Sequence, residues 1–450
     1  MNIRDKEILR IAVPSIVSNI TVPLLGLIDV AIVGHMGDAV YIAAVAVGSM
    51  IFSLIYWLFG FLRMGTSGMT AQAYGRRDLN EVSQVLVRSC LAALGVALTL
   101  IVMQIPLRWL MFWLISPTPE VVPLATRYFS IVIWGAPAML GLYGLSGWFI
   151  GMQNTRIPMF ISIMQNVVNI IASLLLVYGL GMKIEGVATG TVIAQYAGLL
   201  TAVVLLTRYY WRHLHFSGRQ VRDDSLASRR LQATKGRAAD FFRVNRDIFL
   251  RTLCLVAVNL YFTSAGARHG AVILSVNTVI MQLYLLFSYF MDGFAYAGEA
   301  LGGRFYGANN QKAFNETLRH LFLWALAVTA VYTVVYVVGG MWIVGILTNE
   351  PSVIHTAREY IFWAWFIPAA GAAAFIWDGV FIGLTATRGM LISSFVSALL
   401  FFTIYTLAPY LSSLTTHIIP LNHVLWLAMI VYLIMRGIIQ TVWFYGGKAT

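Results

Sequence analysis

The chain contains 450 residues, of which 59% are hydrophobic and only 11% are charged, and its mean hydropathy is +0.79. Soluble domains are nearer to about 45–50% apolar and about 25% charged, so a secreted enzyme, a cytosolic protein and a disordered chain are all excluded. The net charge of +12 does not indicate nucleic acid, because the basic residues lie in short segments beside long apolar runs.

The sequence is predicted to cross a membrane twelve times, because a helix of about 20 mainly apolar residues spans a bilayer. The expected spans are 11–34, 43–71, 89–114, 124–150, 158–180, 186–207, 247–267, 271–300, 320–347, 360–383, 390–411 and 424–445. We therefore expect an all-α polytopic membrane protein with both chain ends on the same side.

The distribution of basic residues predicts which side this is. If both termini are inside, 24 of the 30 Lys and Arg residues lie on the inner side and five lie on the outer side. Cytoplasmic segments retain Lys and Arg. The protein is therefore expected in the inner (plasma) membrane of the cell, with both termini in the cytoplasm.

One connection is much longer than the others and divides the chain. The stretch 208–251 holds eleven basic residues, and its central part is predicted to be a flexible cytoplasmic linker that lies along the membrane surface. The expected parts are an N-terminal six-helix half (1–210), the basic linker (211–246) and a C-terminal six-helix half (247–450).

The two halves repeat each other. The pattern of residues 149–156 recurs at 381–388, and Arg88 matches Arg319 at nearly the same offset along the chain. An even number of spans in each half gives both halves the same orientation, which is a parallel repeat. In transporters such repeats place the substrate path between the halves, so the repeat favours a transporter over a channel.

Three segments resemble the multidrug and toxic compound extrusion (MATE) family, and most closely its DinF-type branch. They are SIVSNITVPLLGLIDVAIVGHMGD in the first span, FLRMGTSGMTAQAYG in the second and YFMDGFAYAGEALGG in the eighth. The resemblance covers all twelve spans. It implies two parallel six-helix repeats and the export of diverse organic compounds driven by an ion gradient.

Charged residues inside the spans are the candidate functional residues. The acids are Asp29, Asp292, Glu299 and Asp378, and Arg63 is expected to be the only base. Each ionised group at the bilayer centre costs roughly 2.5–3.5 kcal/mol on insertion scales, so such groups normally face a protein interior or a wet cavity.

Asp29 is the strongest of these candidates. Ser15, Asn19 and Asp29 share one face of the first span at helical spacing, and Pro23 interrupts that helix, so that it is able to bend. Burial favours the neutral form of a carboxyl group, so Asp29 is expected to take up and release a proton near neutral pH.

A second polar stripe lies on the fifth span. Ser162, Asn166, Asn169 and Ser173 follow one another at intervals of four, three and four residues, which places them on one helix face. At 1.5 Å per residue, Ser173 and Asp29 lie at similar depths, about 22 and about 25 Å from the inner ends of their spans. The two stripes are therefore expected to line one cavity.

The family resemblance implies that Asp29 is the proton- or cation-coupled site, because it occupies the position of the matching first-span carboxylate. Many relatives carry a second carboxylate on the fifth span, four residues after an Asn, where this chain has Ser173. A bare sodium ion needs several oxygen ligands and a compensating charge. The departure favours H⁺ as the coupling ion, with Na⁺ as the alternative.

The C-terminal half offers a second candidate cation site, made of Asp292 and Glu299 on one face of the eighth span together with Asp378. The alternative is a structural pair near the inner surface. Glu299 is also close in depth to Arg63, and the two are predicted to form a gate on the inner side.

We expect a secondary-active exporter that works by alternating access and is not an enzyme. No metal site and no cofactor is expected, since the histidines lack metal-ligand spacing and no phosphate-binding G-x-x-x-x-G-K-[ST] motif is present. The expected partners are small organic compounds, including cationic amphipathic ones, and the lipid bilayer, but not nucleic acid. The chain is expected to be a monomer.

Two other functions stay open. A flippase for lipid-linked oligosaccharides, from the same superfamily, would also be a parallel repeat. Such a flippase generally needs a cavity rich in Arg, and the expectation of a single intramembrane arginine, Arg63, argues against it. A major-facilitator uptake carrier would carry a G-x-x-x-D-[RK]-x-G-[RK]-[RK] loop after its second span, and residues 68–88 lack this motif.

Overall fold

The computed structural model describes the backbone of residues 2–34, 39–215, 224–412 and 420–447, and the side chains of residues 2–21, 32, 40–211, 238–408 and 420–447. Every regular element within these residues is helical. Eleven helices in these parts of the chain are long and apolar enough to cross a membrane.

The first predicted span lies in helix α1 (Ile3–Gly34), part of which falls outside the described side chains. With it, the chain has the predicted architecture of twelve membrane helices. The structure divides into an N-terminal unit, Val13–Asn245, and a C-terminal unit, which comprises Met1–Ala12 and Arg246–Thr450.

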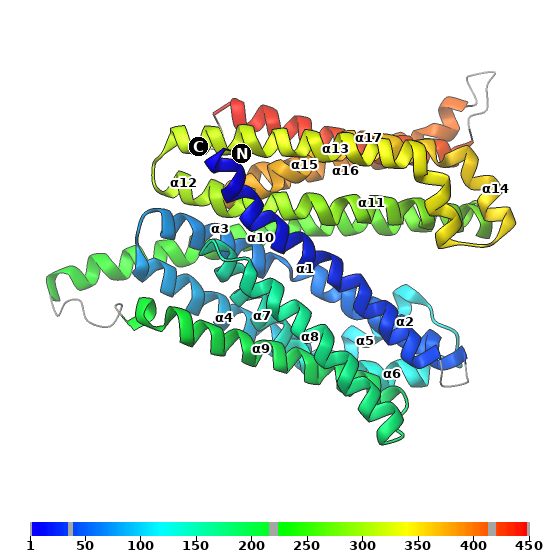
Figure 1. Ribbon diagram of the computed structural model, residues 1–450, viewed down its shortest axis with the longest axis horizontal. Helices are drawn as coiled ribbons and strands as arrows, with labels where there is room; N and C mark the ends of the chain where they lie inside the picture. The colour runs from blue at the N-terminus through cyan, green and yellow to red at the C-terminus, as the bar shows by residue number, and fades with distance from the viewer. Residues whose placement is uncertain (1, 35–38, 216–223, 413–419, 448–450) are drawn as a thin grey trace. The chain divides into compact units, whose positions relative to one another are not determined.

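The N-terminal unit contains α1 from Val13 onward, the helices up to α9 and the first part of α10, up to Asn245 (Figure 1). These elements are α2 (Ala39–Leu58), α3 (Phe61–Gly75), α4 (Leu79–Val102), α5 (Gln104–Ile115), α6 (Val122–Val132), the 3₁₀ turn η1 (Ile133–Gly135), α7 (Ala136–Gly151), α8 (Arg156–Leu174), the π-helical turn η2 (Leu175–Gly179) and α9 (Ile184–His215).

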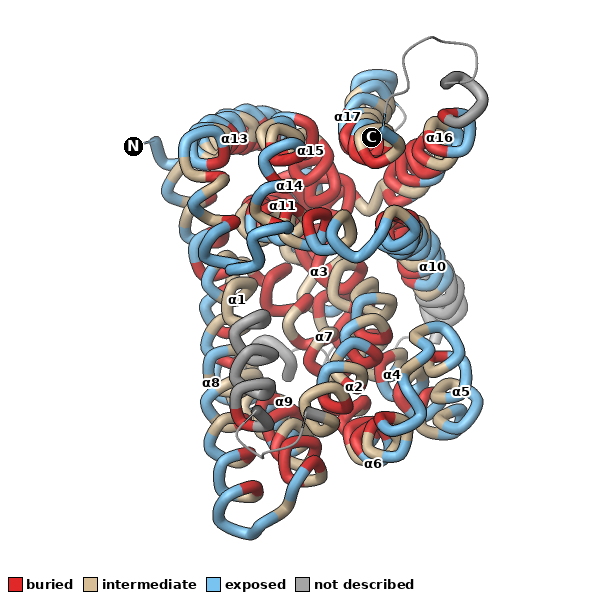
Figure 2. The backbone as a smooth tube through the Cα atoms, turned by 90° about the vertical axis from the view of Figure 1, so that its right-hand side faces the viewer, coloured by how far each residue is buried: buried red, intermediate tan, exposed pale blue. Residues whose placement is uncertain are grey.

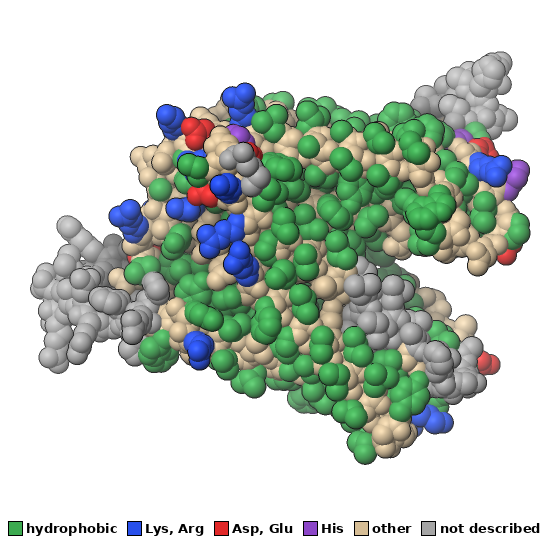
Figure 3. Space-filling model, in the orientation of Figure 1, with side chains coloured by type: hydrophobic (Ala, Val, Ile, Leu, Met, Phe, Trp, Pro, Cys, Tyr) green, Lys and Arg blue, Asp and Glu red, His purple; other side chains and the backbone are tan. Residues whose placement is uncertain are grey.

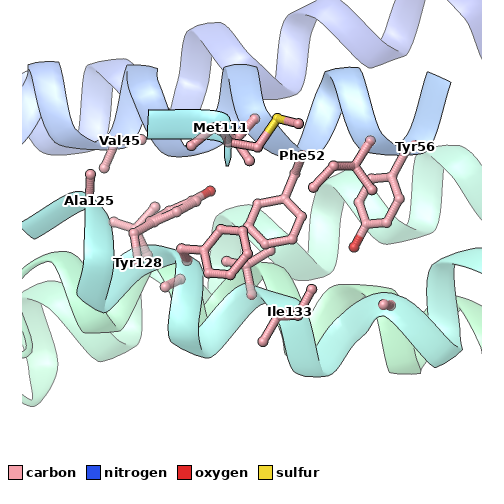
Figure 4. Packing of buried hydrophobic residues seen from close by; sticks show 14 of the residues in the cluster. Val45, Phe52, Tyr56, Met111, Ala125, Tyr128 and Ile133 are labelled. Atoms are coloured by element: carbon pink, nitrogen blue, oxygen red, sulfur yellow. The ribbon is translucent and has the colours of Figure 1, made fainter. Parts of the chain in front are cut away.

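Aromatic and aliphatic side chains from α2, α5 and α6 form a core in this unit (Figure 4). Phe52 stacks on Phe129 with ring centroids 5.2 Å apart, and Tyr128 and Met111 lie in the same cluster. Such packing is needed because apolar surfaces gain little from meeting each other in lipid, so close van der Waals contact holds the helices together.

Besides Met1–Ala12, the C-terminal unit comprises the chain from Arg246, within α10, to Thr450. Its elements are α10 (Asp224–Arg268), α11 (Ala271–Ala297), the π-helical turn η4 (Gly298–Gly302), α12 (Gly303–Gly307), α13 (Gln311–Leu347), α14 (Pro351–Tyr360), α15 (Phe362–Gly383), α16 (Thr387–Ser412) and α17 (Leu421–Tyr445).

Helix α15 is the central helix of the C-terminal unit. It is buried along most of its length and lies between α13 and α17 (Figure 2). The surface helices α11 and α13 carry hydrophobic side chains along their middle parts, and charged side chains gather near the helix ends (Figure 3). This is the pattern expected for helices that face lipid.

The repeat inferred from the sequence is also present in the backbone. Arg77 and Asn309 both adopt a left-handed conformation, with φ of 60° and 53°, and their separation equals that of the segments 149–156 and 381–388. Gln153 and Thr385, with φ of 66° and 53°, belong to those segments themselves. Non-glycine residues rarely adopt positive φ, so matched positions indicate that the same turns recur in both units.

Helix packing repeats with the same offset. A Cβ atom on Gly147 would lie 2.2 Å from the carbonyl oxygen of Arg63, and one on Gly379 would lie 2.1 Å from that of Ala295. Both glycines therefore allow two backbones to approach closely, which small residues permit in membrane helices.

The two units differ from the predicted division at 1–210, 211–246 and 247–450. The first twelve residues belong to the C-terminal unit, because Arg4 and Asp5 bond to side chains of α13. Helix α10 begins at Asp224, within the predicted linker, and runs into the seventh span without a break.

Candidate functional site

The polar stripe of α8 lies on the face turned toward α1 and α9. Asn169 and Ser173 are fully buried, whereas Ile163, Val167 and Ile171 on the same helix are exposed. A helix with one polar and one apolar face inside a membrane protein normally turns its polar face to the interior.

Direct contacts join this stripe to α1. The hydroxyl oxygens of Thr21 and Ser162 are 2.9 Å apart, and the Asn166 side-chain amide donates a hydrogen bond of 2.8 Å to the Thr21 carbonyl oxygen. Further along both helices, the Tyr178 hydroxyl donates to the Ile32 carbonyl oxygen at 3.1 Å. The two sets of contacts bracket residues 22–31 of α1 on one side and the α8 segment with Asn169 and Ser173 on the other.

Two buried oxygen atoms in this segment accept no hydrogen bond from any side chain that the structure describes. The Asn169 amide nitrogen donates to Thr191 at 3.1 Å, but its Oδ1 atom and the Ser173 hydroxyl have no partner there. Buried polar atoms are nearly always bonded. The turn η2 follows directly, and single π-helical turns occur frequently at functional sites.

The remaining predicted residues of this site lie on α1. Asn19 is half-buried and takes part in further interactions. The side chains of Pro23 and Asp29 lie outside the described residues. Their predicted roles therefore stay predictions.

In the C-terminal unit, the three predicted acids lie in different surroundings. Asp292 is half-buried on α11, and Glu299 is only 1% exposed within η4. Both make further interactions. Asp378 is buried on α15, where it contacts α10 and α17.

The Asp378 carboxylate is shared by three donors. Arg251 and Arg436 both donate to its Oδ2 atom, and Gln440 donates to Oδ1 at 2.6 Å. Arg251 and Arg436 are 6% and 3% exposed. The expectation that Arg63 is the only base inside the spans is therefore wrong. Both arginines are near span ends in the sequence, and an arginine at such a position is equally compatible with a side chain that extends to the membrane surface.

This network has more positive than negative charge, because two guanidinium groups face one carboxylate. A bound cation at Asp378 would have to compete with both. The predicted second cation site at Asp292, Glu299 and Asp378 stays a prediction. Arg63 and Glu299 belong to different units, so the predicted gate between them stays a prediction.

Comparison with known proteins identifies relatives across the whole chain. The sequence model of the MatE family matches residues 14–175 and 248–407. The DNA damage-inducible protein F of Escherichia coli is 36% identical over 440 residues, which cover 98% of this chain and 92% of the relative. A probable multidrug resistance protein NorM of Bradyrhizobium diazoefficiens is 24% identical over 85% of this chain and 81% of its own length.

Solved structures share the fold. A MATE protein in a bent conformation superposes with a TM-score of 0.83 at 18% identity, covering 99% of this chain and 96% of that one. A MOP superfamily transporter from Pyrococcus furiosus, described as having a binding pocket of reverse polarity, gives 0.83 at 17% identity with the same coverage. An outward-facing MATE family transporter gives 0.81 at 19% identity, again covering 99% and 96%.

Proposed function

Because the chain belongs to the MatE family of transporters, we propose that it is a secondary-active exporter of small organic compounds, including cationic amphipathic ones. The exporter works by alternating access and is driven by protons that enter through Asp29. It resides as a monomer in the inner membrane, with both termini in the cytoplasm. A relative named as a multidrug resistance protein supports this substrate class.

The observation that carries the proposal is the pair of contacts between α1 and the α8–η2 segment. Asn166 bonds to the backbone at Thr21, and Tyr178 bonds to the backbone at Ile32. Residue 29 is between these two points in the sequence of α1. The α8 segment between the corresponding points contributes the buried oxygens of Asn169 and Ser173.

The side chains of Asn169 and Ser173 suit a carboxyl group that changes its protonation state. An Asn side chain can donate to a carboxylate or accept from a carboxylic acid, and a Ser hydroxyl can do the same. A protonation switch among such groups leaves the carboxyl group with hydrogen-bond partners in either state. Neither side chain adds a negative charge. A bare Na⁺ ion needs several oxygen ligands and a compensating charge, so this segment favours a proton on Asp29 over a bound Na⁺ ion.

The transport cycle follows from this switch. In the outward-facing state Asp29 is ionised and the cavity holds the substrate. A proton from outside neutralises Asp29, the first helix bends at Pro23, and the cavity narrows and releases its substrate. The neutral protein then returns to the inward-facing state more readily, because no bare charge moves into a region of low dielectric constant.

The test is efflux of an ethidium-like dye from proteoliposomes under an imposed pH gradient. Asp29→Asn should abolish efflux driven by the pH gradient without changing the thermal unfolding temperature. Glu120→Gln, which alters an exposed acid between α5 and α6, is the matched control and should transport at the wild-type rate. Undiminished efflux by Asp29→Asn would refute the assignment.

The same vesicles distinguish the coupling ions. An imposed sodium gradient, with the pH held equal on both sides by a proton ionophore, should drive no efflux through the wild-type protein. Efflux under these conditions would replace protons with Na⁺ in the proposal and leave the exporter function in place.

A further inference from the structure

An open hollow of about 570 Å³ lies on the surface of the C-terminal unit, between α13 and α17. Both helices pack on α15 (Figure 2). Phe322 and Phe444 each contact the buried ring of Trp377, with centroids 5.2 and 4.7 Å away. Part of the wall of the hollow is therefore aromatic and packs against the buried interior of the unit.

The lining changes from polar to apolar along α13. Asn315 and Arg319 line the end near the start of the helix, and Leu323 and Leu326 line the part further along. Arg319, Leu323 and Leu326 follow one another at four and three residues, so they share one helix face. The distance along the helix from Arg319 to Leu326 is about 10 Å. Lys312, which is exposed, lies on the same face seven residues before Arg319.

The charge at this hollow differs from that of the equivalent place in the other repeat. Arg88, which matches Arg319 in the repeat, donates to Glu81 at 3.1 Å and to Gln84 at 2.8 Å. The offset that relates these two arginines places Lys312 where the first repeat has Glu81. The internal counter-ion of the first repeat is thus replaced by a second cation.

Arg319 has no hydrogen bond or ion pair with any side chain in the described part of the protein, and no acid lines the hollow. The nearest acid along the helix, Glu316, is bonded to Arg4 at 3.3 Å. Two cations on one face, beside an apolar wall at the end of a membrane helix, match a ligand that has an anionic head and an apolar tail.

We propose that this hollow binds one anionic phospholipid. Its phosphate lies against Arg319 and Lys312 and accepts a hydrogen bond from the Asn315 amide, and one acyl chain covers Phe322, Leu323 and Leu326. Basic residues that are close to an apolar helix face are the usual determinants of anionic lipid binding. A free phosphate ion would leave the apolar wall unused. The site does not depend on the proposed export function.

The test is native mass spectrometry of the full-length protein, released from mixed micelles that contain equal amounts of phosphatidylglycerol and phosphatidylcholine. The wild-type protein should retain phosphatidylglycerol preferentially. Arg319→Ala should lower this retention about five-fold or more, the expected effect of one basic residue near anionic lipid. Arg388→Ala removes an exposed arginine elsewhere in the same unit and should leave retention unchanged.

A second pair of variants tests the apolar part. Leu323→Trp fills the hollow while keeping both cations, and should also reduce retention. Val338→Trp, on an exposed part of the same helix, should not. Equal retention of the two lipids by the wild-type protein, or equal losses in Arg319→Ala and Arg388→Ala, would overturn the proposal. Displacement of the lipid by millimolar inorganic phosphate would also overturn it, in favour of a simple anion site.

Discussion

Two guanidinium groups and one amide share the carboxylate of Asp378, which lies on α15, a helix that is buried along most of its length. Removal of one partner from a buried ion pair leaves an uncompensated charge that water cannot solvate, and typically costs about 3–5 kcal/mol. The single acid in this network therefore contributes more to stability than either of its two bases.

We predict that Asp378→Asn lowers the free energy of unfolding by about 3–5 kcal/mol, because both Arg251 and Arg436 then lack a counter-charge. Arg251→Met should cost less, since one arginine and one carboxylate remain paired. Thermal unfolding of the purified protein in detergent measures both effects. Glu359→Gln, at a side chain that is 59% exposed, is the control. Equal stability of Asp378→Asn and this control would contradict the prediction.

The sequence alone reveals the acids inside the spans, but it does not reveal the arginines that bond to Asp378. An acid within an apolar run is conspicuous because it has no cheap solution in lipid. Arg251 and Arg436 are near the ends of their spans, where an arginine normally extends to the interface. Their burial depends on how three helices, α10, α15 and α17, come together, and no local pattern in the sequence contains that information.

At the scale of one element, α1 begins in one unit and continues in the other. His320 Nδ1 and Trp324 Nε1 lie 2.8 and 3.1 Å from Asp5 Oδ1. The guanidinium of Arg4 bonds to Glu316 and lies 4.6 Å from the ring centroid of Phe305. These contacts attach the first turns of α1 to α12 and α13.

The hydrogen bond with His320, aided by those from Trp324 and the backbone of Asn2, lowers the pKa of Asp5 below its ordinary value of 3.8. An acid whose pKa is depressed by folding stabilises the folded state above its unfolded pKa, and this stability is lost as the pH falls through the folded value. The stabilisation by Asp5 is therefore fully present at neutral pH.

We predict that Asp5→Asn lowers the thermal unfolding temperature at pH 7, and that the difference from wild type narrows below about pH 4. Thermal unfolding measured from about pH 7 to about pH 3 tests this expectation. Asp240→Asn, at an exposed surface pair with Arg243, should show little effect at any pH. A difference between Asp5→Asn and wild type that stays constant with pH would show that the ionised carboxylate is not the stabilising group.

Gly147 and Gly379 each lie where two helix backbones approach closely. A methyl group on Gly147 or Gly379 would lie 2.2 or 2.1 Å from a backbone oxygen, so the helices have to separate. Each Gly→Ala change should destabilise the protein by about 1–3 kcal/mol. Gly345→Ala in α13, where a Cβ meets no atom within 4 Å, should be neutral or slightly stabilising in the same unfolding assay. Similar losses at all three positions would exclude close packing as the cause.

At the scale of the whole molecule, the number of helices and the repeat could be predicted because both follow from apolar length and from sequence periodicity. The offset found in the sequence recurs in the turns at Arg77 and Asn309 and in the glycine contacts of α7 and α15. The assignment of the first twelve residues to the C-terminal unit could not be predicted. It depends on side-chain contacts between residues 312 and 315 positions apart, and the sequence pattern places those residues only at the end of a span.

The charge distribution predicts the orientation of the molecule, and this orientation would decide which leaflet supplies the lipid proposed for the hollow beside Arg319. The topology predicted from the sequence puts 24 of the 30 basic residues on one side, including Arg251 and Arg436, and that side is expected to be cytoplasmic. In a background with Cys90→Ser and Cys254→Ser, Glu120→Cys should react with a membrane-impermeant maleimide in intact cells. Lys312→Cys should react only after lysis, although both positions are exposed. Each variant controls for the reactivity of the other, and the opposite labelling pattern would invert the predicted orientation while leaving the fold unchanged.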